Sequence, residues 1–202
     1  KGSRTVLLGE NGCGKTTLLR LISRLEKPTR GVILQNIDDK FGQKSKQSKK
    51  WYKKVGVVYQ NPDYQLFMQT VEKEIKFGAK SDEYADEIAE KFGIKHLYAR
   101  HPQSLSEGQK RRVSIAAVVA TDPEVLILDE PTVGQDYKGL CEMVEVLNKL
   151  HEEAHNTMIT VTHDKRCAAA LCDKSVWIKN GKTYKTGGKE LVDEFFIQIG
   201  VN

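Results

Sequence analysis

Residues 9–16 have the residue types and spacing of a phosphate-binding loop. They read Gly-Glu-Asn-Gly-Cys-Gly-Lys-Thr and fit the pattern G-x-x-x-x-G-K-[ST]. Glycines let backbone N–H groups turn toward an anion, and Lys15 adds a positive charge for the β- and γ-phosphates of a nucleotide. The Thr16 hydroxyl is an oxygen ligand of the kind that Mg²⁺ prefers. The residues predicted to bind the nucleotide here are Gly9, Glu10, Asn11, Gly12, Cys13, Gly14, Lys15, Thr16 and Thr17.

Two acidic residues follow a strand-like segment further along the chain. Residues 125–128 are continuously apolar, as in a strand buried on both faces of a parallel sheet, and they lead into Asp129 and Glu130. Acids at the carboxyl end of such a strand lie in the ligand crevice of an open α/β sheet. We expect Asp129 to hold Mg²⁺ through water and Glu130 to polarise an attacking water.

These side chains need a sheet and helices to position them. The apolar run at 5–8 precedes the glycine-rich loop and a helical pattern follows it, so the loop has a strand–loop–helix setting. The chain therefore predicts an α/β fold with a mostly parallel sheet flanked by helices. The predicted strands lie near residues 5–8, 32–35, 55–59, 125–129, 157–162, 175–179 and 182–186. The predicted helices lie near residues 15–25, 82–92, 107–120, 137–154, 164–171 and 188–198.

A third segment, Leu105-Ser106-Glu107-Gly108-Gln109, precedes the helical pattern at 107–120. Ser106 and Gln109 have the spacing of a capping box. The segment also closely resembles the signature sequence of ATP-binding cassette (ABC) ATPases. The other motifs of that family occur in the right order: Gln60 resembles the Q-loop glutamine, residues 133–136 resemble the D-loop, and His163 resembles the switch histidine. The resemblance covers nearly the whole chain.

This resemblance implies a P-loop NTPase fold, with a RecA-like core and an inserted helical subdomain, that binds ATP and Mg²⁺. It places Mg²⁺ on Thr16, Gln60 and Asp129. Catalysis then falls to Lys15, to Glu130 as the general base, and to His163 between the γ-phosphate and the attacking water. Two cassettes pack head to tail in this family. The signature residues Ser106, Gly108 and Gln109 of one cassette then cover the γ-phosphate bound by the other, and Asp136 communicates between the two sites.

The string from Tyr59 to Phe67 resembles the Q-loop region of the energy-coupling-factor importers, which take up vitamins and transition-metal ions. That branch implies an integral membrane transporter subunit as a partner, beside a second cassette that is identical or different. The expected organisation is one ABC ATPase domain, with its core at 1–60 and 115–202 and a helical subdomain at 61–114 that meets the membrane protein. The family's N-terminal strands and any C-terminal extension are expected to be missing from residues 1–202.

Composition agrees with one α/β domain outside the bilayer. The 202 residues carry a net charge of +5, no apolar run approaches the roughly 20 residues of a membrane span, and no signal peptide is visible. We expect a cytoplasmic protein, peripheral on the inner face of the cell membrane through its partner. The cysteines Cys13, Cys141, Cys167 and Cys172 lack metal-type spacing, which favours free thiols.

Two alternatives remain open. Six lysines at 44–54 permit a non-transport ABC ATPase that acts on nucleic acid or the ribosome, although a solvated loop is the favoured explanation and no nucleic acid is expected. The chain also permits the cassette of another ABC transporter class. The sequence differs from the usual signature at one position, because Glu107 stands where the family usually has glycine. An acid near a phosphate is unfavourable unless its side chain turns away.

Overall fold

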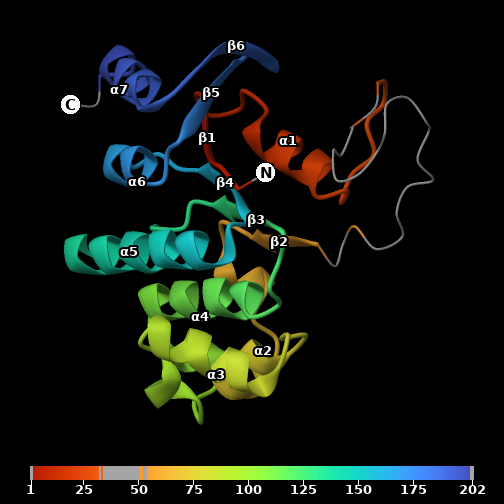
Figure 1. The fold of residues 1–202 in the computed structure, drawn as a ribbon, viewed down its shortest axis with the longest axis vertical. Helices are drawn as coiled ribbons and strands as arrows, with labels where there is room; N and C mark the ends of the chain where they lie inside the picture. The colour runs from red at the N-terminus through yellow and green to blue at the C-terminus, as the bar shows by residue number, and fades with distance from the viewer. Residues whose placement is uncertain (1, 32, 34–50, 52–53, 201–202) are drawn as a thin grey trace.

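The computed structural model describes residues 2–31, 33, 51 and 54–200. In this part of the chain, six strands form one sheet in the order β2-β3-β4-β1-β5-β6 (Figure 1). The strands are β1 (Arg4–Leu8), β2 (Val55–Val58), β3 (Val125–Asp129), β4 (Thr157–Val161), β5 (Lys174–Lys179) and β6 (Lys182–Gly187). Neighbouring strands are parallel except for the antiparallel pair β5–β6. The predicted, mostly parallel sheet is confirmed, and the strand predicted near 32–35 lies outside the described residues apart from residue 33.

Seven α-helices occur in the described residues. They are α1 (Lys15–Ile22), α2 (Val71–Lys76), α3 (Asp82–Lys91), α4 (Glu107–Val119), α5 (Tyr137–Ala154), α6 (Lys165–Ala170) and α7 (Lys189–Gln198). Three short 3₁₀ helices join them: η2 (Pro62–Tyr64), η3 (Lys95–Leu97) and η4 (Pro102–Ser104). The predicted helices are present, with the first ending three residues earlier than expected. Helix α2 has no counterpart among the predicted helices.

The sheet separates two apolar layers. Leu7, Ile127 and Val161 face Leu19 of α1 on one side, whereas alternate residues such as Leu126 and Leu128 face the α5 side. Figure 1 shows α1 on one side of the sheet and α5 and α6 on the other. Because both faces of β3 are covered, its continuous apolar run is explained.

Helix α4 joins the sheet to the smaller helices. Its buried residues Val113, Ile115 and Ala116 belong to one apolar cluster that contains α2 and α3 side chains as well as β3 side chains. The predicted division between residues 114 and 115 therefore falls inside a continuous helix. The separation into a core and a helical subdomain stays a prediction. None of the described helices is long and apolar enough to span a bilayer.

Candidate functional site

The glycine-rich loop connects β1 to α1. Lys15, the first residue of α1, is buried, and its ammonium donates to the carbonyl oxygens of Gly9 (2.7 Å) and Glu10 (3.0 Å). Gly14 caps α1 with φ of 105° and provides no side-chain acceptor for the first N–H groups of the helix. These N–H groups remain directed to the loop side, where a helix N-terminus attracts phosphate. Thr16 and Thr17 follow on the exposed side of α1, and Glu10, Asn11 and Gly12 are also exposed.

The glycine-rich loop packs closely against β5 and the β5–β6 turn. A Cβ atom at Gly9 would lie 2.5 Å from both Cys13 Sγ and the carbonyl oxygen of Ile178, so no side chain fits there. Gly181 in the β5–β6 turn donates its N–H to the carbonyl of Cys13 at 3.0 Å. The loop conformation therefore depends on a strand pair far away in sequence.

Three predicted metal ligands share one cavity. Thr16, Gln60 and Asp129 line a space of about 270 Å³ between α1, the end of β2 and the end of β3. They offer a hydroxyl, an amide and a carboxylate oxygen, a donor set that suits Mg²⁺. Asp129 is 9% exposed, and burial raises the pKa of its carboxyl against the lowering influence of Lys15 and Arg111.

Glu130 has an unusual backbone and a buried side chain. Its φ is 54°, in the left-handed region that a residue with a side chain rarely adopts, and its side chain is almost fully buried. One carboxylate oxygen accepts the backbone N–H of His163 at 3.2 Å, while the other lies 3.7 Å from His163 Nε2 and has no hydrogen-bond partner in the described residues. Burial, the largest influence, raises the pKa of the Glu130 carboxyl. The structure therefore brings Glu130 and His163, two of the predicted catalytic residues, into contact.

The segment that carries Gln60 is held by two side chains that sequence reasoning did not assign. Arg111 of α4, only 2% exposed, donates to the carbonyl oxygens of Tyr59 (2.6 Å) and Gln60. Gln65 accepts from the N–H of Tyr59 at 2.9 Å and donates to the carbonyl of Val57 at 2.8 Å. Gln65 belongs to the string from Tyr59 to Phe67 and Arg111 follows the signature segment, but the sequence pattern does not indicate which backbone groups they contact.

The signature segment forms the predicted capping box. Ser106 caps α4 by accepting from the Gln109 N–H at 3.3 Å, and Gln109 accepts from the Ser106 N–H at 3.1 Å. Gly108 lies close to the D-loop, because a Cβ atom there would be 3.0 Å from the carbonyl oxygen of Gly134 and Gln135 donates to the Gly108 carbonyl at 2.8 Å. None of the three signature residues lines the cavity at Thr16, and their contact with a nucleotide on a second cassette stays a prediction.

Asp136 has a local structural contact. It caps α5 by accepting the N–H of Gly139 at 2.7 Å. Its predicted role in communication between two nucleotide sites stays a prediction.

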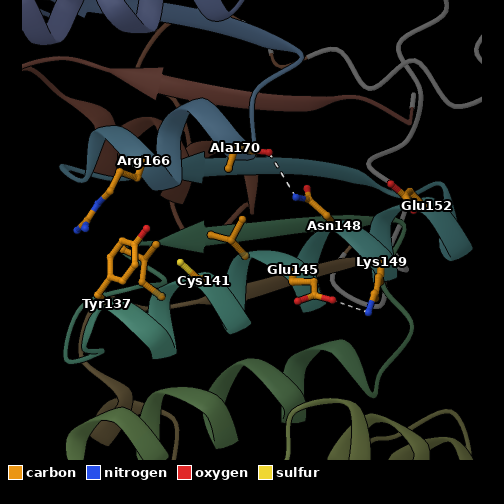
Figure 2. A pocket seen from close by; sticks show the side chains of 10 residues that line it. Tyr137, Cys141, Glu145, Asn148, Lys149, Glu152, Arg166 and Ala170 are labelled. Atoms are coloured by element: carbon orange, nitrogen blue, oxygen red, sulfur yellow. Dashed lines mark hydrogen bonds and ion pairs between the residues drawn. The ribbon is translucent and has the colours of Figure 1, made fainter.

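A cavity of about 540 Å³ lies elsewhere, between α5 and α6 (Figure 2). Tyr137, Cys141 and Arg166 stand at one end of it, and Glu145 and Lys149 form an ion pair of 2.7 Å toward the other. It contains none of the predicted site residues. Its size alone therefore does not indicate the chemistry.

The remaining sequence predictions concern thiols and lysines. All four cysteines are free, as predicted. Most of the lysine-rich run at 44–54 lies outside the described residues. Lys54, at its end, pairs with Glu124 at 2.7 Å. This part of the run therefore has a partner within the protein.

The chain is similar to known transporter ATPases. The family model described as ABC transporter matches residues 1–133. The chain is 42% identical over 207 residues to the energy-coupling factor transporter ATP-binding protein EcfA2 of Enterococcus faecalis, covering 95% of this chain and 70% of that protein. It is 41% identical to EcfA2 of Bacillus subtilis, with 93% and 71% covered.

Two solved structures share the fold. The cbiO1 structure from Clostridium perfringens, part of the ABC transporter complex cbiONQ, gives a TM-score of 0.79 at 34% identity, with 96% of this chain and 80% of that chain covered. An ATP-binding cassette solved as a dimer in a post-hydrolysis state with ADP and Pi gives a TM-score of 0.80 at 26% identity, with 93% and 86% covered.

Proposed function

This chain belongs to the ABC transporter family of ATPases, and we propose that it is the ATP-hydrolysing subunit of an energy-coupling-factor importer. One observation carries the proposal. Thr16, Gln60 and Asp129 line a single cavity, and Glu130 follows Asp129 directly with its carboxylate against His163. Residues distant in sequence thus meet at the carboxyl edge of the sheet, where an α/β fold binds its ligand.

The residues divide the work of phosphoryl transfer, which consists mostly of positioning and charge stabilisation. The loop N–H groups and Lys15 hold the β- and γ-phosphates. On binding, the Lys15 ammonium exchanges its carbonyl contacts for phosphate oxygens. Glu130, whose free oxygen faces His163, orients the attacking water and accepts its proton, and His163 contacts the γ-phosphate.

The donor set fits Mg²⁺. Thr16, Gln60 and Asp129 supply oxygen atoms only, and burial disfavours the charged form of Asp129 until a cation offsets it. When bound, Mg²⁺ neutralises charge on the phosphates. In the described residues no three His, Cys, Asp or Glu side chains cluster as a metal site. Thr16, Gln60 and Asp129 would hold the ion together with the nucleotide.

A second cassette completes the site. Ser106, Gly108 and Gln109 stand at the N-terminus of α4 and do not line the cavity of their own chain. We place them over the γ-phosphate of ATP bound by a partner cassette, where the N–H groups at a helix start suit an anion. One solved relative of the same fold is a dimer with ADP and Pi, which supports this arrangement.

The membrane partner contacts the segment after Gln60. Tyr64, Phe67 and Phe77 are 80%, 67% and 59% exposed, and the rings of Phe67 and Phe77 pack edge to face at 5.4 Å. Exposed aromatic side chains that gather in one region mark an interaction surface. We propose that an integral membrane subunit docks here. It would hold this protein at the inner face of the membrane while the transporter takes up a metal ion or a vitamin.

The test is Mg²⁺-dependent ATP hydrolysis by Glu130→Gln beside the unaltered protein. Loss of the general base lowers turnover about a hundredfold or more, while ATP binding persists because the loop and Lys15 are intact. Glu145→Gln on the exposed face of α5 is the matched control and keeps full turnover. Unchanged hydrolysis by Glu130→Gln removes Glu130 as the base.

A further inference from the structure

Three charges meet at the start of α4. The Lys110 ammonium lies 2.9 Å from a carboxylate oxygen of Asp63 in η2 and 3.5 Å from one of Glu107. The Lys110 side chain is 9% exposed, against 42% for Asp63 and 68% for Glu107. The hydrogen bond with Asp63, the largest influence, raises the pKa of the Lys110 ammonium. The Lys110 side chain is thus covered by the rest of the chain, whereas the two carboxylates beside it are exposed.

Glu107 occupies a position where its charge matters. It is the first residue of α4, beside the Ser106 cap, so the free N–H groups of the helix lie next to it. A carboxylate attracted to this positive end competes with a phosphate for the same N–H groups. Glu107 also lies beside the D-loop, since a Cβ atom at Gly134 would be 3.4 Å from the Glu107 Cβ, an ordinary contact distance. A cation three residues later in the helix attracts the carboxylate away from the N-terminus.

We propose that Lys110 is a positioning residue that draws the Glu107 carboxylate back along α4 and leaves the helix N-terminus open to the γ-phosphate of ATP on the partner cassette. The inference rests on the proposed function, since it requires that a partner's nucleotide meets this helix end. Asp63 orients Lys110 for this task. The cluster explains how the signature segment tolerates an acid in place of glycine.

The test compares Lys110→Met, Glu107→Gly and the double variant in the protein assembled with its native second cassette and membrane subunits. ATP hydrolysis gives KM and kcat for each assembly. Lys110→Met frees the Glu107 charge and raises KM for ATP about fivefold to tenfold. The double variant returns to within about twofold of Glu107→Gly, because the charge that Lys110 controls is gone. Asp63→Asn gives a smaller rise in KM than Lys110→Met.

Two controls separate this effect from general damage. Lys149→Met removes another helical lysine that pairs with a glutamate four residues before it, and it leaves KM unchanged. A fluorescent ATP analogue added to the isolated chain reports binding at the chain's own phosphate loop, which Lys110→Met does not weaken. A loss of binding there would show that Lys110 supports the fold and would overturn the proposal.

Several results contradict the inference. If the double variant is as impaired as Lys110→Met, then Lys110 does not act through Glu107. An unchanged KM in Lys110→Met also overturns the proposal. Equal turnover of the unaltered and Glu130→Gln assemblies would instead contradict the proposed catalytic site, whatever the charge cluster does. If the unaltered assembly hydrolyses no ATP, both proposals fail.

Discussion

Glu130 combines three conditions that oppose stability. Its backbone is in the left-handed region, its side chain is buried, and one carboxylate oxygen has no hydrogen-bond partner in the described part of the chain. Such a combination is expected where a side chain is held for chemistry. The sequence predicted its role from the position after β3, but the backbone conformation and the free oxygen depend on β4 and on His163.

In the absence of nucleotide, replacing the Glu130 carboxylate with an uncharged side chain should stabilise the protein. The pKa of Glu130 is raised on folding, so at neutral pH, where the unfolded chain is ionised, the buried charge costs folding free energy. Glu130→Gln removes that cost, and its melting temperature at pH 7.5 should exceed that of the unaltered protein. The difference should shrink as the pH falls and the carboxyl becomes protonated. A lower melting temperature for the variant at pH 7.5 would contradict this.

The cysteines should react in an order set by burial. Burial raises the pKa of Cys167 to about 12, so at pH 8 only about a ten-thousandth of this thiol is ionised. Cys141 is exposed, and Cys13 is partly exposed in the phosphate loop. Alkylation followed by mass spectrometry should modify Cys141 quickly and Cys167 only after unfolding. MgATP should protect Cys13 and leave Cys141 unaffected, which provides the internal control.

At the scale of elements, regular patterns were readable and tertiary contacts were not. Continuous apolar runs located β1 and β3, and the capping box located α4. Helix α2 was missed because a charged residue, Glu74, is buried on its apolar face, and that burial depends on a contact outside the helix. One Glu74 carboxylate oxygen accepts the N–H groups of Phe67 and Met68 at 2.9 and 2.7 Å. The structural roles of Arg111 and Gln65 were missed because their partners are backbone groups, which the sequence pattern does not identify.

Contact between β2 and α4 depends on the absence of a side chain at Gly56. A Cβ atom there would lie 2.5 Å from Val118 Cγ1 and 3.1 Å from Pro123 Cγ. Gly56→Ala should therefore destabilise the protein by about 1–3 kcal/mol in urea unfolding. Val118→Ala in the same chain removes the closest atom and should recover part of that loss. Full stability of the single variant would mean that the strand and helix separate without cost.

The link between β1 and β5 should depend on pH. The Arg4 guanidinium hydrogen-bonds to Asp173, and this contact lowers the pKa of Asp173 below its ordinary 3.8. A lowered folded pKa stabilises the fold above the ordinary value and ceases to do so as the pH falls through the folded value. Asp173→Asn should cost about 1 kcal/mol at pH 7, because the pair is partly exposed.

Urea unfolding measures this difference at pH 7 and at pH 3, where it should be smaller. Glu145→Gln, which breaks an exposed pair within α5, should have little effect at either pH. A loss in Asp173→Asn that is equal at both pH values would exclude the ion pair as its cause.

At the scale of the whole molecule, function should depend on assembly. The signature residues do not line the cavity of their own chain, so under the proposed arrangement a lone cassette lacks part of the site. If two copies of this chain form the working pair, the hydrolysis rate per molecule should rise with protein concentration. A rate that is independent of concentration would contradict self-assembly. The family resemblance predicted the need for a second cassette. It did not predict whether that cassette is identical or different, because the same motifs occur in homodimers and heterodimers.

The strand order also determines when, during translation, the chain can begin to bind nucleotide. Strand β4 lies between β1 and β3, and the N–H of Gly181 closes on the phosphate loop. A nascent chain that has exposed all of residues 1–133, which match the family model, still lacks the strand that joins β1 to β3. Nucleotide binding should therefore begin late in translation, after residue 181 has left the ribosomal exit tunnel. Ribosome-bound chains arrested before that point should gain no protease protection from MgATP.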